Sequence, residues 1–93
     1  MHARISTWRV RPEEYDQIDR EVSPHIAELK RQPGYIAGYE VRPSPDRMLT
    51  ITVWADEAQM EAGFARVMPA LSSIMDGRME LVDRTVGPAE ELG

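Results

Sequence analysis

The segment from Met48 to Ala55 reads MLTITVWA, and its alternation decides the class of fold. One set of alternate positions is aliphatic and consists of Leu49, Ile51 and Val53. The other set is polar or aromatic and consists of Thr50, Thr52 and Trp54. Because successive side chains of a strand point to opposite faces of a sheet, this period of two predicts a strand. We expect the aliphatic set to pack under helices and the other, half-polar set to lie on the opposite face.

Three more strands are predicted on either side of this segment. Residues 35–41, YIAGYEV, are rich in aromatic and β-branched residues, and the turn-forming sequence RPSPD at 42–46 makes the two segments a hairpin. Residues 2–10 also alternate, with one face made of Arg4, Ser6 and Trp8. Residues 79–86 predict the last strand, and residues 87–93 a mobile acidic tail.

Apolar residues recur at spacings of three and four in two longer segments, which predicts two amphipathic helices. The first covers roughly residues 12–31 and the second roughly residues 57–75. Pro24 and Pro69 lie inside these segments and predict local bends. Asp56 and Gln59 have the spacing of a capping box at the start of the second helix. The order strand, helix, strand, strand, helix, strand predicts an α+β fold, the ferredoxin-like βαββαβ sandwich, with two helices on one face of an antiparallel four-stranded sheet.

Length and composition exclude several classes of site and partner. The 93 residues predict one domain spanning 1–93, and the lack of cysteine excludes disulfides, thiolate metal sites and a thiol nucleophile. A formal net charge of −5 disfavours nucleic acid as a partner. Neither a membrane-spanning stretch nor an apolar leader segment is present in the sequence, so we expect a cytoplasmic protein. The two histidines are far apart and have no metal-ligand spacing, so no metal is expected.

The face of the sheet expected to lie away from the helices predicts a homodimer. It would carry Arg4, Ser6, Trp8, Thr50, Thr52 and Trp54. Such a face is too aromatic to remain fully hydrated, and a small core gains stability from a partner subunit. We expect a second copy of the sheet to cover this face, with Trp8 as the anchor of the interface.

Two stretches resemble a known family. Residues 32–40, QPGYIAGYE, and residues 52–58, TVWADEA, are similar to the antibiotic biosynthesis monooxygenase-like domains of the dimeric α/β barrel superfamily. The resemblance implies a dimeric barrel, and the family includes cofactor-independent oxygenases of polycyclic phenols and haem-degrading oxygenases. In the catalytically understood branches an Asn on the first strand and a Trp on the third recur, and haem degraders add a His on the second helix.

This chain keeps the tryptophan, as Trp54, and lacks the other family residues. It contains no Asn, so Ser6 or Thr7 would have to replace the amide. Residues 57–75 contain no His, and Phe64 stands near the place where the family has it. Because a haem iron needs an axial ligand such as His, Cys or Tyr, the resemblance does not extend to haem degradation. No cofactor is therefore expected.

Five residues are candidates for a site. His25, next to the apolar stripe of the first helix, is the candidate base; the alternative is a structural histidine bonded to the backbone near Pro24. The candidate ligand-binding residues are Trp54, Tyr39, Phe64 and Ser6. The alternative for Trp54 is a core or interface anchor, and the alternative for Tyr39 is an amphipathic residue of the sheet.

Two functions follow from these residues. The first is a cofactor-independent monooxygenase that deprotonates a small aromatic or quinol-type compound, whose anion then reacts with oxygen. The second is a non-catalytic homodimer, either ligand-binding or stress-associated, in which the tryptophans serve packing and the pocket lacks a base. Both predict a pocket between helices and sheet for a small apolar or aromatic ligand.

Overall fold

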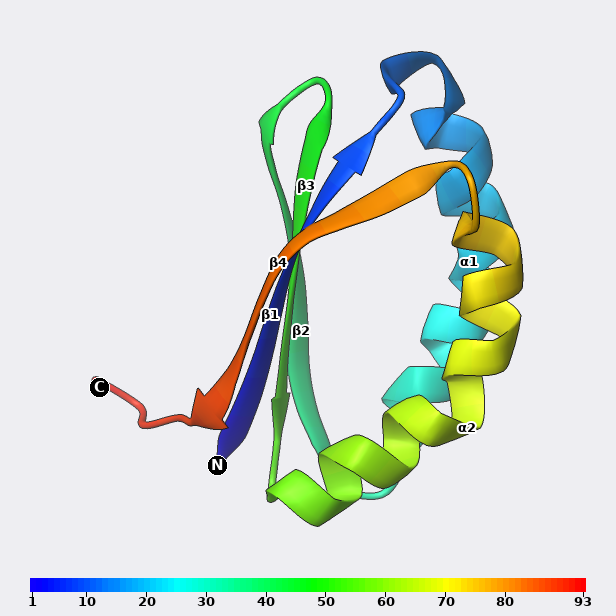
Figure 1. Cartoon of the computed structure of the whole chain (residues 1–93). Helices are drawn as coiled ribbons and strands as arrows, with labels where there is room; N and C mark the ends of the chain where they lie inside the picture. The colour runs from blue at the N-terminus through cyan, green and yellow to red at the C-terminus, as the bar shows by residue number, and fades with distance from the viewer.

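The computed structural model describes residues 1–93, and its strands form one antiparallel sheet (Figure 1). The strands are β1 (His2–Val10), β2 (Tyr35–Ser44), β3 (Arg47–Trp54) and β4 (Met79–Pro88), in the order β2-β3-β1-β4. The helices are α1 (Tyr15–Lys30), which follows a short 3-10 turn at Pro12–Glu14, and α2 (Glu57–Met75). The predicted ferredoxin-like βαββαβ fold is confirmed.

The element boundaries follow local chemistry. Asp56 caps α2 as predicted, because its Oδ1 accepts a hydrogen bond of 2.8 Å from the backbone N–H of Gln59. Gly34 adopts a φ of +86° in the turn that leads from α1 into β2, a conformation that glycine reaches without steric cost. Both helices continue through their internal prolines, Pro24 and Pro69. β4 runs to Pro88, two residues into the segment expected as a tail, and the Ala89 N–H donates to the Met1 carbonyl.

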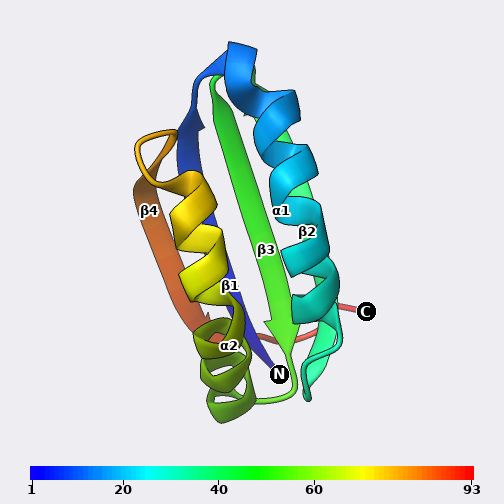
Figure 2. The same cartoon turned by 90° about the vertical axis from the view of Figure 1, so that its right-hand side faces the viewer.

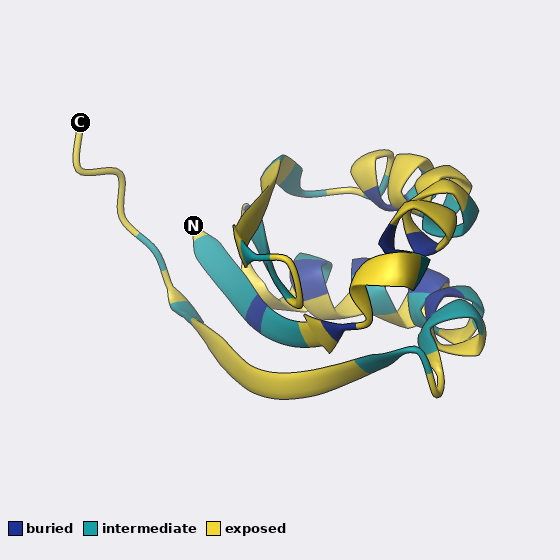
Figure 3. Cartoon of the chain, turned by 90° about the horizontal axis from the view of Figure 1, so that it is seen from above, coloured by how far each residue is buried: buried dark blue, intermediate teal, exposed yellow.

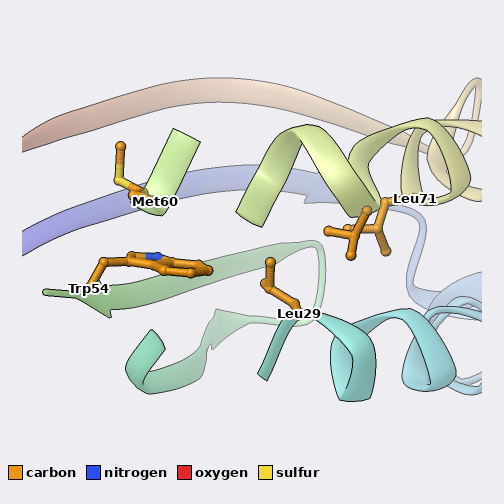
Figure 4. Close-up of a cluster of buried hydrophobic side chains, with 5 residues drawn as sticks. Leu29, Trp54, Met60 and Leu71 are labelled. Carbon is orange, nitrogen blue, oxygen red and sulfur yellow. The ribbon is translucent and has the colours of Figure 1, made fainter. Parts of the chain in front are cut away.

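Both helices cover the same face of the sheet, and the opposite face carries no element (Figures 2 and 3). Two apolar clusters fill the layer between helices and sheet. The larger cluster contains Leu29, Trp54, Met60, Val67 and Leu71 (Figure 4). The smaller cluster contains Val10, Tyr15 and Ile18. The core therefore lies on the helix side of the sheet alone.

The predicted assignment of the two faces of β3 is wrong. Trp54 is fully buried under the helices, with its ring 5.4 Å from the Tyr35 ring and 5.6 Å from the Phe64 ring between centroids. Alternation then places Thr50 and Thr52 on the same inner face. The aliphatic residues of β3 consequently face away from the helices.

A close contact on α2 explains why Trp54 can face inward. Gly63 is buried, and a Cβ at this position would lie 2.5 Å from Cη2 of Trp54. The missing side chain lets the helix backbone approach the indole. The large ring therefore fills the gap between helix and sheet, a space that Leu49 or Val53 would fill less completely.

The outer face of the sheet is apolar along its three adjoining strands. The register aligns Ile5 of β1, Ile51 of β3 and Tyr39 of β2, and it aligns Thr7, Leu49 and Val41. Tyr39 is 62% exposed and Val41 is 44% exposed. The exposed apolar surface of the sheet is therefore this outer face and not the face that contains the tryptophans.

Candidate functional site

A cavity of about 320 Å³ lies between the sheet and the helices. Its volume is in the range of small-molecule sites. On the sheet side it is lined by inner-face residues of the two central strands, which are Arg4, Ser6, Trp8, Thr50 and Thr52. On the helix side it is lined mainly by apolar residues, which include Ile18, Val22, Phe64, Met68 and Met75. The cavity thus has apolar walls and a polar strip along the sheet.

The cavity brings together three of the five predicted site residues. Ser6 and Phe64 line it from the inner side, and Tyr39 borders it at the edge strand β2. Trp54 does not, because its ring is enclosed among Tyr35, Phe64 and the core. It packs behind the cavity wall, against Phe64.

His25 also lies outside the lining of the cavity. It is half-buried on α1, four residues after Glu21 and three before Glu28. Glu21 pairs with Arg78, which follows α2, and Glu28 pairs with Arg66, which is on α2. Since residues three or four apart share one face of a helix, His25 is on the side of α1 that faces α2. Its role as a base stays a prediction.

The polar strip contains two arginines, Arg4 on β1 and Arg84 on β4. The Arg4 guanidinium lies 3.9 Å from the centre of the Phe64 ring. The Arg84 Nε donates a hydrogen bond of 3.0 Å to Ser6 Oγ, and its guanidinium lies 5.8 Å from the centre of the Trp8 ring. Burial, together with the neighbouring Arg84 charge, lowers the pKa of Arg4 to about 10. Burial also lowers the pKa of Arg84.

Two hydroxyl groups near this strip lack a protein partner. Thr52 Oγ1 is buried without a hydrogen bond, and the register places Thr52 directly opposite Arg4. The Tyr35 hydroxyl lies against Gly38, where a Cβ would collide with it. Burial raises the pKa of Tyr35, so this hydroxyl stays protonated and can donate to a ligand.

The opposite end of the cavity, near the start of α1, is held by a polar cluster. The Tyr15 hydroxyl donates to Glu40 Oε1, and the Arg42 guanidinium lies 3.1 Å from the centre of the Tyr15 ring. Burial is the main cause that raises the pKa of Tyr15. Glu40 is thereby engaged by α1 and fixes the distance between that helix and β2.

Reasoning from the sequence missed Trp8, Thr52 and the arginines as cavity residues. Arg4, Trp8 and Thr52 were grouped correctly on one face, but that face was assigned to the dimer interface. An arginine beside aromatic residues is also common in the core of an interface, so the sequence pattern of this face could not separate an interface from a cavity wall. Arg84 had no signal, since only the pairing of β4 with β1 places it opposite Ser6.

No three His, Cys, Asp or Glu side chains come together in a group that could hold a metal ion. None of the helices is long and apolar enough to span a membrane.

Solved structures similar to this fold include one cofactor-independent oxygenase. SnoaB, a cofactor-independent oxygenase from Streptomyces nogalater, superposes with a TM-score of 0.77 at 17% identity, over 97% of this chain and 93% of its own. HapK from Hahella chejuensis superposes with a TM-score of 0.79 at 17% identity, over 100% and 96%. MupZ from Pseudomonas fluorescens superposes with a TM-score of 0.82 at 15% identity, over 98% and 74%. At these identities the likeness establishes the fold.

Sequence comparison gives the family. A search of curated protein sequences returned no match. The sequence profile of the antibiotic biosynthesis monooxygenase domain matches residues 1–64, from the first residue of the chain to Phe64 on α2. This range includes β1, α1, β2, β3 and the N-terminal half of α2, and with them most of the cavity. The chain therefore belongs to the antibiotic biosynthesis monooxygenase family.

Proposed function

We propose that this protein is a cofactor-independent monooxygenase acting on a small aromatic or quinol-type compound. The observation that carries the proposal is the cavity of about 320 Å³ with aromatic and thioether walls and a polar strip on the sheet. Sites for small organic ligands have this composition, with apolar walls and a few placed polar groups. Membership of the monooxygenase family supports the assignment of chemistry to the cavity.

The reaction needs only the substrate and oxygen. Removal of a proton from a phenol, hydroquinone or anthrone gives an electron-rich anion that reduces oxygen directly. For an anthrone, the methylene carbon becomes a carbonyl: one oxygen atom forms the new carbon–oxygen bond, and the other leaves as water with the two hydrogens of the methylene group. The substrate supplies all four electrons, so no external reductant is required.

The contribution of the protein is to bind, orient and ionise the substrate. The neutral Tyr35 hydroxyl is placed to donate to a substrate oxygen, and the thioethers of Met68 and Met75 fit rings of varied shape. His25 remains the candidate base by the sequence prediction, although it lies beside the cavity and not on it. A base at that place would have to act through water or after a local movement of α1.

Oxygen consumption with a panel of hydroquinones and anthrones tests the proposal. We expect substrate-dependent uptake of one O₂ molecule per anthrone molecule, without added metal, flavin or haem. The matched pair of variants is His25→Ala and His2→Ala, which each remove one imidazole from the chain. Loss of turnover in the first alone assigns His25 as the base, and equal turnover in both removes it. No uptake with any substrate refutes the oxygenase.

The second candidate function is a non-catalytic homodimer that binds a ligand or acts in a stress response. The observation that favours it is the position of His25 outside the cavity lining, which leaves the cavity without an imidazole base. Binding of aromatic compounds without oxygen uptake would support this function over the first.

We also propose that both functions use a homodimer formed through the outer face of the sheet. The aliphatic residues Ile5, Ile51, Leu49 and Val41 supply the apolar surface. A specific stable interface buries about 1,200–2,000 Å² in total, and a sheet face of this kind can supply it. Sedimentation equilibrium is the test, and a monomer of 10.6 kDa at micromolar concentration would contradict it.

A further inference from the structure

Arg4 and Arg84 form a pair of guanidinium groups without any carboxylate partner. Seven of the other arginines lie within salt-bridging distance of an acidic side chain, and they are Arg9, Arg11, Arg31, Arg42, Arg47, Arg66 and Arg78. The remaining one, Arg20, is exposed and donates to its own helix. The chain has 16 acidic residues against 11 basic ones, so acidic partners are abundant. The two arginines that line the cavity are left without one.

The two unpaired charges lie on the same face of adjacent strands. Arg84 is opposite Ser6 in the register of β1 and β4, and Arg4 is two residues before Ser6. Diagonal neighbours of this kind lie within reach of each other when their side chains are long. Burial lowers the pKa of Arg4, and the neighbouring Arg84 charge lowers it further. A pair of like charges in a half-buried place is unfavourable unless something negative joins them.

The surroundings of the pair fit an anion. Thr52 Oγ1, buried without a partner opposite Arg4, can donate its proton to an acceptor in the cavity. Phe64 and Trp8 lie beside the two guanidinium groups and hold them by their ring faces, leaving the N–H groups of Arg4 without a protein acceptor. The acidic residues that line the cavity, Glu40 and Asp19, belong to β2 and α1 and contact neither arginine.

We propose that the cavity binds an aromatic compound carrying an oxygen anion, a carboxylate or an ionised phenol, whose negative group is received by Arg4, Arg84 and Thr52. The ring of the ligand then lies among Trp8, Met68 and Met75. The aromatic nature of the ligand rests on the proposed function, and the new element is the negative charge of the ligand. It also gives the oxygenase a means to ionise its substrate, because a guanidinium beside a phenol stabilises the phenolate.

Isothermal titration calorimetry with 2-naphthoate and its neutral isostere 2-naphthamide tests the charge. We expect the wild-type protein to bind the acid at least about tenfold more tightly than the amide, since hydrogen bonds to charged groups contribute that much. Arg4→Gln should weaken the acid about 10- to 100-fold and change the amide by less than about twofold. The matched control is Arg9→Gln, which removes an exposed arginine of the same strand that pairs with Glu80 and should change neither affinity.

A second ligand distinguishes the two sources of the anion. The absorption spectrum of 2-naphthol separates the phenol from the phenolate, and we expect binding to lower the pH at which it ionises. If 2-naphthoate binds through Arg4 but bound 2-naphthol stays neutral, the site is a carboxylate site. If Arg4→Gln does not fold, Thr52→Val and Arg84→Gln provide the same comparison, and each should lose less affinity for the acid than is expected of Arg4→Gln.

Three results would overturn the inference: equal affinity for the acid and the amide, no binding of the acid, or an acid affinity that Arg4→Gln leaves unchanged. These results are independent of the oxygenase assay. Oxygen uptake with neutral anthrones, combined with no preference for the acid, would refute the anion site and leave the proposed function standing. Preference for the acid without any oxygen uptake would support the anion site and refute the proposed oxygenase.

Discussion

Gly63 of α2 and Trp54 of β3 are in direct contact, and replacing Gly63 with alanine tests how closely helix and sheet are packed there. The added Cβ would lie 2.5 Å from Cη2 and 2.8 Å from Cζ3 of the indole, and 3.3 Å from Cβ of Gln32 on another side. Carbon atoms in good contact are about 3.5–4.0 Å apart. The methyl group therefore overlaps the indole by about 1 Å and cannot move away from it freely.

Two effects of opposite sign determine the change in stability. Alanine favours a helix interior over glycine by about 1 kcal/mol. Overpacking a close contact costs about 1–3 kcal/mol, and the fully buried indole has no free space to move into. We expect Gly63→Ala to lower the free energy of unfolding by up to about 2 kcal/mol after the helix gain is subtracted.

The sign should reverse when the indole is reduced. In a Trp54→Phe background the outer atoms of the indole are absent, so the methyl group enters free space and the helix preference for alanine remains. The coupling between the two substitutions should be about 1–3 kcal/mol. Urea unfolding followed by circular dichroism, at one fixed protein concentration, measures all four proteins of the cycle.

Ala65→Gly is the control, because Ala65 is exposed on the same helix and reports the helix preference alone. It should destabilise the protein by about 1 kcal/mol in both backgrounds. Additive effects of Gly63→Ala and Trp54→Phe would refute the contact. A Gly63→Ala protein more stable than wild type would refute it as well.

Three further predictions concern the dimer, the arginine pair and the cluster around Tyr15. Ile51→Glu should convert a dimer to a monomer in sedimentation equilibrium, because Ile51 lies on the outer face. Trp8→Ala should remain dimeric, because Trp8 lines the cavity. A monomeric Trp8→Ala and a dimeric Ile51→Glu would show that the interface is on the inner face. Arg4→Met should raise the free energy of unfolding at pH 7, measured in urea, by about 1 kcal/mol. The reason is that the folded protein holds the Arg4 charge in an unfavourable, half-buried place, an effect that solvent screening reduces. The folded pKa of Arg4, about 10, lies below the ordinary value of an arginine, so above about pH 10 the folded protein binds fewer protons than the unfolded chain. Wild-type stability should therefore gain on the variant as the pH rises from about 10 toward that ordinary value, and a destabilised Arg4→Met at pH 7 would contradict the pKa direction. Tyr15→Phe loses the hydrogen bond to Glu40 and should be less stable by about 1–2 kcal/mol at neutral pH. Because the pKa of Tyr15 is raised above 10.0, this difference should be complete below pH 10 and shrink as the pH rises through the folded pKa; a constant difference in urea unfolding would count against it.

Local sequence patterns determined the elements and their order. The bounds of α2 were predicted as observed, since Asp56 supplies the cap and Asp76-Gly77 the end. The hairpin was predicted with a turn that proved shorter, because Arg42, Pro43 and Ser44 continue β2 at the edge of the sheet, where proline is tolerated. Helix capping and turn conformation depend on neighbours a few residues apart, and this is why the sequence alone reveals them.

The candidate site was predicted in part. Ser6, Phe64 and Tyr39 line the cavity as expected, whereas Trp54 supports its wall and His25 lies to one side. The apolar spacing of the first helix predicted which of its sides is buried, and Tyr15, Ile18 and Leu29 are buried there. It could not separate the sector that faces the cavity from the sector that faces α2, because that depends on where the second helix packs.

The sequence by itself determined that β3 has two different faces, one aliphatic and one of threonine and tryptophan. Only the tertiary structure decided which face the helices cover. Period-two alternation sorts side chains into two sets but carries no information on what packs against each set. Here the small Gly63 admits the Trp54 indole under α2, so the mixed set borders a cavity and the aliphatic set faces outward. The pairing of β4 with β1 then brings Arg84 beside Arg4, across 80 residues of chain, and such a juxtaposition arises only from folding.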